Sequence, residues 1–289
     1  MEYIIHILVI SGIYAILSMS LNLIVGYTGL PALGHAAFSC IGAYTSSLLA
    51  LNLGISPWIG LVAGFFFATV TGLIFSFPAL RLKGDYLALA TLGLNVIIYG
   101  IVKNWVSLTR GPMGLPGIPT FAIFNLQISE IWQYLIIVLI FVLFSFFFFW
   151  RITESPFGRL LKGIREDEKA IQMMGINTIK YKVQVFMIGA GFAGLAGTLY
   201  AHYITFIDPS SFTITESISI LLMVIFGGMA NLYGSIIGAI VLVVMPEILR
   251  FIGLPSSVAA PLRQMIYGFL LVILMIKRPQ GILGEYRIR

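Results

Sequence analysis

Long apolar runs, separated by short stretches of glycine, proline or charge, dominate this chain of 289 residues. Between residues 3 and 80 there is no Lys, Arg, Asp or Glu, whereas one helix crosses the hydrocarbon core of a bilayer with about 20 apolar residues. Several crossings therefore fit into this stretch alone. Over the whole chain the runs predict spans near residues 3–25, 33–52, 57–79, 86–104, 131–150, 183–205, 216–230, 233–249 and 262–276.

The glycine-rich segment 26–34 leaves the count of crossings open, because it can be a loop or a broken or re-entrant helix. We therefore expect an all-α, polytopic transmembrane helical bundle of about 8 to 10 spans. No linker or low-complexity segment divides the chain. Residues 1–289 are predicted to form a single membrane domain.

The composition agrees with a membrane protein, since 59% of the residues are hydrophobic and 10% are charged, against about 25% charged residues in soluble domains. The net charge of +6 does not indicate nucleic-acid binding, because the basic residues lie in loops between the apolar runs. The single cysteine, Cys40, cannot form an intrachain disulfide. The N-terminus lacks the basic region of a secretory signal, so the first span is expected to be retained.

Basic residues are concentrated in two places. Seven Lys or Arg lie between residues 151 and 182, and four more follow residue 275. Because cytoplasmic loops carry an excess of Lys and Arg, both segments, and with them the C-terminus, are predicted to face the cytoplasm. The loop 103–130, with two basic residues, then faces outward.

The segment 151–182 also contains five consecutive charges, in the stretch GIREDEK at residues 163–169. Burying a charged side chain in a membrane costs about 2.5–3.5 kcal/mol, so the segment is expected to lie in water. Ser155 followed by proline can begin a helix and Gly175 can end it, which predicts one amphipathic helix on the membrane surface. Asn177 can cap the next helix. The expected apolar face contains Phe157, Leu160, Leu161, Ile164, Ile171 and Met174. The pattern supports equally a plain surface helix and an element that docks a soluble partner.

Residues 26–35 read GYTGLPALGH and interrupt the first two apolar runs. Irregular backbone inside a membrane is tolerated only where protein or a water-filled cavity surrounds it, and its free N–H and C=O groups can bind a zwitterion. This predicts a translocation path. The candidate residues are Asn22, Tyr27, Gly29, Gly34, His35 and Ser39. The alternative is a tight loop or helix kink in which His35 bonds to the backbone, and a lone histidine does not make a metal site.

Residues 189–194 spell G-x-G-x-x-G, the fingerprint of dinucleotide-binding folds. They lie in an uncharged stretch with no preceding strand, so cofactor binding is not expected. Gly189, Ala193 and Gly197 recur every four residues, which favours close packing between helices.

Five long blocks of the sequence are distinctive. They are GRLLKGIREDEKAIQMMGINTIKYKVQVFMIGAGFAGLAGTLYA from residue 158, LNLIVGYTGLPALGHAAFSCIGAYT from 21, PALRLKGDYLALATLGL from 78, TRGPMGLPGIP from 109 and ISILLMVIFGGMANLYGSIIGA from 218. Together they closely resemble the membrane subunits of branched-chain amino acid ABC importers, specifically the M-type (LivM) permeases. The resemblance covers nearly the whole chain, in order.

The resemblance implies a permease in a prokaryotic cytoplasmic (inner) membrane. Its partners would be a second, H-type permease, two cytoplasmic ATPases and an extracytoplasmic amino-acid-binding protein. ATP and Mg would lie on the ATPases, with no cofactor or metal in this chain, and the sequence contains no G-x-x-x-x-G-K-[ST] motif. The ATPase-coupling positions carried over are Arg159, Arg165, Glu166, Asp167, Glu168 and Gly175. The chain departs from the general importer signature because Gly175 follows Ala170 by five positions instead of four.

Other functions remain possible from the sequence. A permease of the same family could carry urea or short amides. An ion-coupled secondary transporter would be expected to hold an ionisable side chain near the middle of a span, and Glu216 and Glu247 lie at the edges of apolar runs, where an interfacial position is expected. The sequence shows no paired carboxylates, nucleophile motif or metal-ligand cluster, so we do not expect an enzyme.

Overall fold

The computed structural model describes residues 2–82, 84–123, 126–127, 130–251, 265, 268–269, 272 and 281–284. The long helices are α1 (Glu2–Asn22), continued by the π-helix η1 (Leu23–Tyr27), α2 (His35–Leu53), α3 (Pro57–Ala79), α4 (Asp85–Asn104), α6 (Ile131–Glu154), α9 (Thr178–Ile204), α10 (Ile214–Gly227) and α11 (Leu232–Phe251). The short helices are α5 (Val106–Thr109), η2 (Gly111–Met113), α7 (Pro156–Glu166), α8 (Glu168–Met173) and η3 (Pro209–Phe212). Strand β1 (Leu115–Pro116) pairs antiparallel with β4 (Phe206–Ile207), and β2 (Ala122–Ile123) with β3 (Leu126–Gln127).

Six helices are long and apolar enough to cross a membrane: α1 with η1, α2, α3, α4, α6 and α9. They coincide with the first six predicted spans and confirm an all-α membrane fold. The seventh and eighth predicted spans correspond to α10 and α11, whose apolar parts are shorter, at residues 214–227 and 232–247. Most of the ninth, at 262–276, lies outside the described residues. A total of about 8 to 10 crossings remains a prediction.

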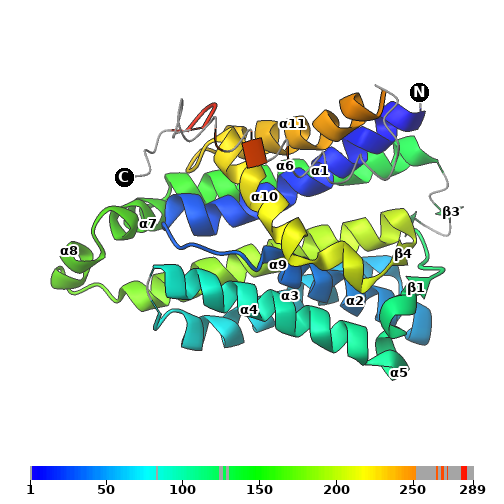
Figure 1. Ribbon diagram of the computed structural model, residues 1–289, viewed down its shortest axis with the longest axis horizontal. Helices are drawn as coiled ribbons and strands as arrows, with labels where there is room; N and C mark the ends of the chain where they lie inside the picture. The colour runs from blue at the N-terminus through cyan, green and yellow to red at the C-terminus, as the bar shows by residue number, and fades with distance from the viewer. Residues whose placement is uncertain are drawn as a thin grey trace.

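Most of the long helices run roughly along one direction, α10 crosses them obliquely, and α9 lies in the middle of the bundle (Figure 1). It is the most buried of the six candidate spans. Helices α7 and α8 lie at one end, and β1 and β4 lie at the other (Figure 1). The predicted charged segment and the predicted outward loop are therefore at opposite ends of the bundle.

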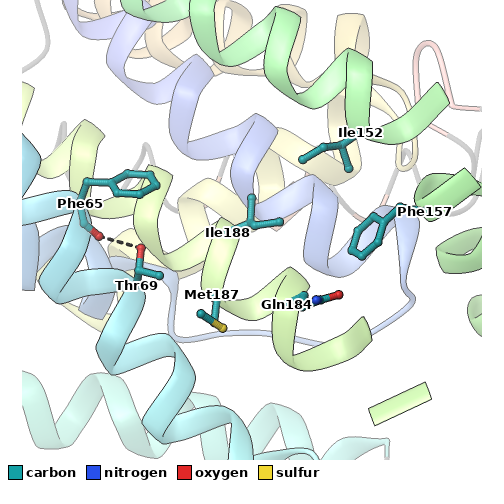
Figure 2. Close-up of a pocket in the computed structure, with 7 residues that line it drawn as sticks. All are labelled: Phe65, Thr69, Ile152, Phe157, Gln184, Met187 and Ile188. Carbon is teal, nitrogen blue, oxygen red and sulfur yellow. Dashed lines mark hydrogen bonds between the residues drawn. The ribbon is translucent and has the colours of Figure 1, made fainter. Parts of the chain in front are cut away.

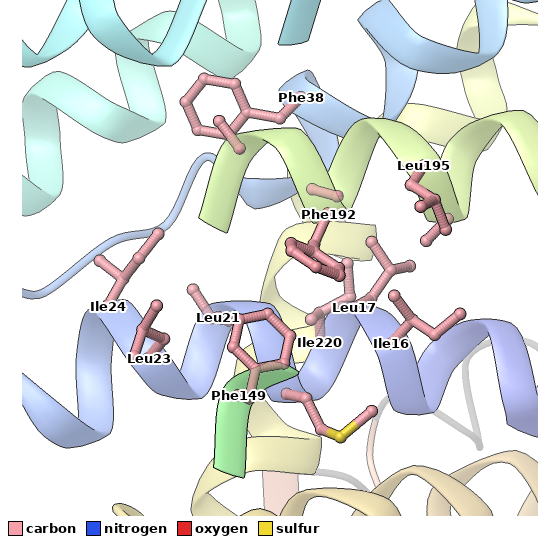
Figure 3. Packing of buried hydrophobic residues seen from close by; sticks show 14 of the residues in the cluster. Ile16, Leu17, Leu21, Leu23, Ile24, Phe38, Phe149, Phe192, Leu195 and Ile220 are labelled. Atoms are coloured by element: carbon pink, nitrogen blue, oxygen red, sulfur yellow. The ribbon is translucent and has the colours of Figure 1, made fainter. Parts of the chain in front are cut away.

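Helix α9 packs closely because small residues line it. A Cβ on Gly42 of α2 would collide with the backbone of Gly194, and a Cβ on Gly194 would collide with Ala68 of α3 and lie 2.7 Å from the Gly64 carbonyl oxygen. The dinucleotide-like motif is therefore a helix-packing surface, as its spacing predicts. On its other side α9 inserts Phe192 among core residues of α1 and α6, with ring centroids 4.6 Å from Phe149 (Figure 3).

Gly194→Ala is expected to destabilise the bundle by about 1–3 kcal/mol, because the added methyl group must push α3 away from α9. The matched control is Gly93→Ala in α4, where an added Cβ meets nothing within 4 Å. This change should be neutral or stabilising by up to about 1 kcal/mol. Thermal unfolding of the detergent-solubilised variants measures both. Equal midpoints for the two variants would contradict the packing argument.

Candidate functional site

The charged segment folds as two helices, which corrects the prediction of one. The chain breaks at Asp167, whose φ and ψ of −151° and 95° are extended and whose side chain accepts a hydrogen bond from the Ala170 N–H at 3.0 Å. Aspartate at such a position caps a new helix instead of continuing the old one. The outer boundaries are as predicted. Ser155 accepts from the Gly158 N–H, Asn177 accepts from the Lys180 N–H, and Gly175 has a left-handed φ of +81°.

The break changes which apolar side chains are covered. Leu161 and Ile164 of α7 are buried, as predicted. Met174, which was assigned to the same covered face, is instead 75% exposed, and its neighbour Met173 is 86% exposed. Helix α8 starts from a new direction after Asp167, so the helical periodicity of α7 does not continue into it. The result is a pair of large apolar side chains presented outward at the end of the molecule.

The six predicted coupling residues separate into three groups. Arg159, Glu166, Asp167 and Gly175 are exposed. Glu168 contacts the first turns of α9, where it pairs with Lys182 at 2.7 Å and accepts a hydrogen bond from the Thr178 hydroxyl at 2.9 Å. Arg165 turns toward the bundle and is 10% exposed.

The glycine-rich segment separates two long helices, which is one of the alternatives that the sequence leaves open. Helix α1 ends in a π-helical turn, residues 28–34 run without regular structure, and His35 begins α2. Thr28 donates a hydrogen bond to the Ile24 carbonyl. Gly34 fits directly against the Thr91 backbone, where a Cβ would collide.

Asn22 fixes one side of this break. Its amide donates to the Asn231 carbonyl at 2.9 Å and to the Ser235 hydroxyl at 2.7 Å, and its Oδ1 accepts from the Ala230 N–H at 2.9 Å. The side chain thus ties the end of α1 to the turn between α10 and α11. Its three polar contacts within protein give it a cross-linking position between helices.

A buried polar cluster lies at the start of α2. The His35 Nε2 lies 2.7 Å from the Ser20 hydroxyl, so the partner of this ring nitrogen is a side chain and not the backbone of the kink alternative. Its Nδ1 has no hydrogen-bond partner among the described residues, and the same holds for Asn95 Oδ1. Asn95 donates to the Ser217 hydroxyl, which also accepts from the Ala36 N–H, both at 3.0 Å.

Buried polar atoms normally have partners, because leaving one unpaired costs about 1–3 kcal/mol. The cluster is therefore suited to a polar species passing through the bundle. The Thr91 hydroxyl also belongs to this region, because it accepts a hydrogen bond from the Leu33 N–H at 2.9 Å. Sequence reasoning missed Thr91, Asn95 and Ser217. A signal existed, because Thr91 and Asn95 are four residues apart inside an otherwise apolar span and so share one helix face.

The remaining path candidates lie nearby but differ in character. Ser39 is buried and donates to the Ala36 carbonyl of its own helix at 3.0 Å. It also lines a narrow cavity together with Tyr14 and Glu216. Tyr27 is buried, and Lys162 of α7 lies over its ring, 5.8 Å from the centroid.

Glu216 lies in the first turn of α10 and is partly buried. Tyr14, near the middle of α1, donates a hydrogen bond to it. Both residues line a cavity of about 180 Å³ that also has apolar walls, including Met223 and Leu242. The cavity, with its mixture of polar and apolar walls, lies between α1, α10 and α11.

A third cavity, of about 480 Å³, lies between α3, α6, α7 and α9 (Figure 2). Its lining residues are Phe65, Thr69, Ile152, Phe157, Gln184, Met187 and Ile188. The Thr69 hydroxyl is already bonded to the Phe65 carbonyl at 2.8 Å. This almost wholly apolar space offers few hydrogen-bonding groups to a charged solute. None of its lining residues is among the predicted coupling or translocation-path residues.

Residues 3–275 match the family described as "Branched-chain amino acid transport system / permease component". The chain belongs to this family. The permease is 37% identical to "High-affinity branched-chain amino acid transport system permease protein LivM" of Escherichia coli (strain K12), over 95% of this chain and 68% of that protein. It is 27% identical to the probable LivM permease of Methanocaldococcus jannaschii, over 95% and 91% of the two chains. The LivH permease of the same E. coli strain is 23% identical, over 94% and 91%.

The two candidate regions of the permease meet at Arg165. Its Nη1 donates a hydrogen bond of 2.7 Å to the Gly26 carbonyl, and a Cβ on Gly29 would lie 2.8 Å from the Arg165 Cγ. The charged segment and the glycine-rich break are more than a hundred residues apart in the chain. They are nevertheless in direct contact in the fold.

Proposed function

We propose that the permease is a membrane-spanning subunit of an ATP-binding-cassette importer that carries leucine, isoleucine, valine or similar amino acids across the prokaryotic cytoplasmic membrane. The observation that carries the proposal is the 37% identity to a LivM permease over 95% of this chain. The names of these relatives supply the substrate class. These names favour branched-chain amino acids over urea or short amides as substrates. They also favour an ATP-driven importer over an ion-coupled carrier.

The same relatives support a partner permease. LivM and LivH of the same E. coli strain are both named as permeases of a high-affinity branched-chain amino acid transport system, so we propose that this chain pairs with an H-type permease. Two cytoplasmic ATPases with their ATP and Mg, and an extracytoplasmic binding protein, complete the proposed importer. The permease itself then catalyses no reaction.

We place α7 and α8 on the cytoplasmic side as the element that docks an ATPase. The support is the group of seven basic residues in 151–182, together with the position of both helices at one end of the bundle (Figure 1). Large apolar side chains exposed beside charges are typical of a partner interface. Met173 and Met174 supply the apolar part, and Glu166 and Lys169 supply exposed charges.

The substrate path is proposed to pass the polar cluster at His35 and Asn95. An amino acid zwitterion needs hydrogen-bonding groups along its route through the bundle, and a broken helix provides them. The cavity beside Glu216 adds a carboxylate that can attract an ammonium group and aliphatic walls that suit a branched side chain.

The test is leucine uptake by proteoliposomes that contain this permease with its partner permease, ATPases and binding protein. Uptake should require ATP inside the vesicle together with the binding protein, and it should continue when an ionophore collapses the ion gradients. Uptake that persists without ATP and stops with the ionophore would overturn the proposal. Uptake of urea instead of leucine would overturn the substrate class alone.

A further inference from the structure

Arg165 of α7 faces the bundle, whereas the next residue faces solvent. The Arg165 side chain is 10% exposed and that of Glu166 is 62% exposed. On one side the Arg165 guanidinium donates to the Gly26 carbonyl at 2.7 Å, and on the other it donates to Glu166 Oε1 at 2.9 Å. A partner that docks on the outer side of α7 therefore reaches Glu166 before Arg165.

The Gly26 carbonyl needs a donor from outside its own segment. In a π-helix each carbonyl accepts a hydrogen bond from the N–H of the residue five positions later in the chain. For Gly26 that residue is Pro31, and proline has no N–H. The two preceding amides are bonded elsewhere, with Gly29 donating to Val25 and Leu30 donating to Ile24. An unpaired carbonyl is costly away from water, so Arg165 supplies a bond that the local sequence cannot make.

Glycine makes room for this contact on one side, and Asn22 fastens the π-helix on the other. Gly29 has a left-handed φ of +67°. The aliphatic part of the Arg165 side chain occupies the space that a side chain on residue 29 would need. A Cβ on Gly26 would collide with Asn22, which in turn accepts a hydrogen bond from the Ala230 N–H. Direct contacts thus run from α7 through η1 to the turn between α10 and α11, with a hydrogen bond at each end and the close packing of Gly26 against Asn22 between them.

We propose that Arg165 is a positioning residue that transmits movement of α7 to the π-helical end of α1, and that it is not an ATPase contact. The proposal rests on the importer function proposed above. Single π-helical turns occur often at functional sites, and a break in a helix can take two discrete arrangements. The end of α1 also reaches the polar cluster, because Ser20 contacts His35. Displacement of α7 therefore pulls on the Gly26 carbonyl and shifts the helix that borders the substrate path.

The test compares Arg165→Met and Arg165→Lys in the complete reconstituted importer. Methionine keeps the aliphatic arm but donates no hydrogen bond. Its complex should bind the ATPases in wild-type amounts and hydrolyse ATP, but leucine uptake per ATP should fall about tenfold or more, as expected for loss of one charge-assisted hydrogen bond. Lysine keeps the positive charge but not the planar guanidinium group. Uptake per ATP by the Arg165→Lys complex should therefore lie between that of the wild type and that of Arg165→Met.

The matched control is Arg151→Met, which removes an exposed cation from the last turn of α6. Its uptake per ATP should equal that of the wild type. Hydrogen exchange at residues 23–30 of the detergent-solubilised permease reads the contact directly and does not require assembly. Exchange there should rise in Arg165→Met and stay unchanged in Arg151→Met.

Two outcomes would overturn the assignment. One is wild-type uptake per ATP with unchanged exchange at residues 23–30. The other is loss of ATPase binding in proportion to the loss of uptake, which would make Arg165 a docking contact. Absence of ATP-driven uptake in the wild-type complex would instead refute the proposed function, and the exchange measurement would still decide whether Arg165 holds the break.

Discussion

Replacing Met173 and Met174 with serine is expected to weaken binding of the ATPase subunit to the permease by roughly 2–4 kcal/mol. The two side chains are 86% and 75% exposed in this chain. Burying a methionine side chain contributes about 1.5–3 kcal/mol, and interface anchors are usually apolar groups that become fully covered. Helix α8 is also held firmly enough to present them, because Glu168 pairs with Lys182 of α9. The affinity of purified ATPase for immobilised permease measures the effect.

Met113→Ser is the matched control for this double substitution. Met113 is also strongly exposed, but it lies in η2, in the predicted outward loop between α4 and α6. Its replacement should leave ATPase affinity unchanged. Wild-type affinity in the Met173 and Met174 variant, or an equal loss in the Met113 variant, would contradict docking through α8.

Local patterns predicted the parts of this fold that depend on local physics. The six long spans follow from runs of apolar residues, since a helix satisfies its own backbone in lipid. The small residues from Gly189 to Gly197 predicted close helix packing because their four-residue spacing places them on one face. The helix caps at Ser155 and Asn177 were also predictable, since each cap bonds to an amide three residues away.

Features that depend on distant residues were missed. Whether Asp167 continues α7 or caps α8 is not decided by its neighbours alone, because Glu168 is drawn to Lys182 at the start of α9. Met174 was consequently placed on the wrong face. The inward turn of Arg165 depends on a carbonyl at Gly26, 139 residues away in the chain. No periodicity within the charged segment contains that information.

The role of Asn22 also depends on residues that are distant in the chain. We expect Asn22→Leu to destabilise the permease strongly. The sequence marked Asn22 as a path residue because it is polar inside a span. In the fold it makes two donated hydrogen bonds and one accepted hydrogen bond, to Asn231, Ser235 and Ala230. Leucine of similar size would leave the Ala230 N–H without its acceptor in a buried site. We expect a loss of roughly 3 kcal/mol or more in the free energy of unfolding.

Thermal unfolding of the solubilised permease separates the two roles of Asn22. Ser39→Ala is the control, because the Ser39 hydroxyl bonds only to a carbonyl of its own helix among the described contacts. Its loss should cost less than about 1 kcal/mol. A cross-link predicts a strongly lowered midpoint for Asn22→Leu and little change for Ser39→Ala. A path residue predicts a stable Asn22→Leu variant that assembles normally but takes up leucine slowly, and that result would contradict the structural role argued for Asn22.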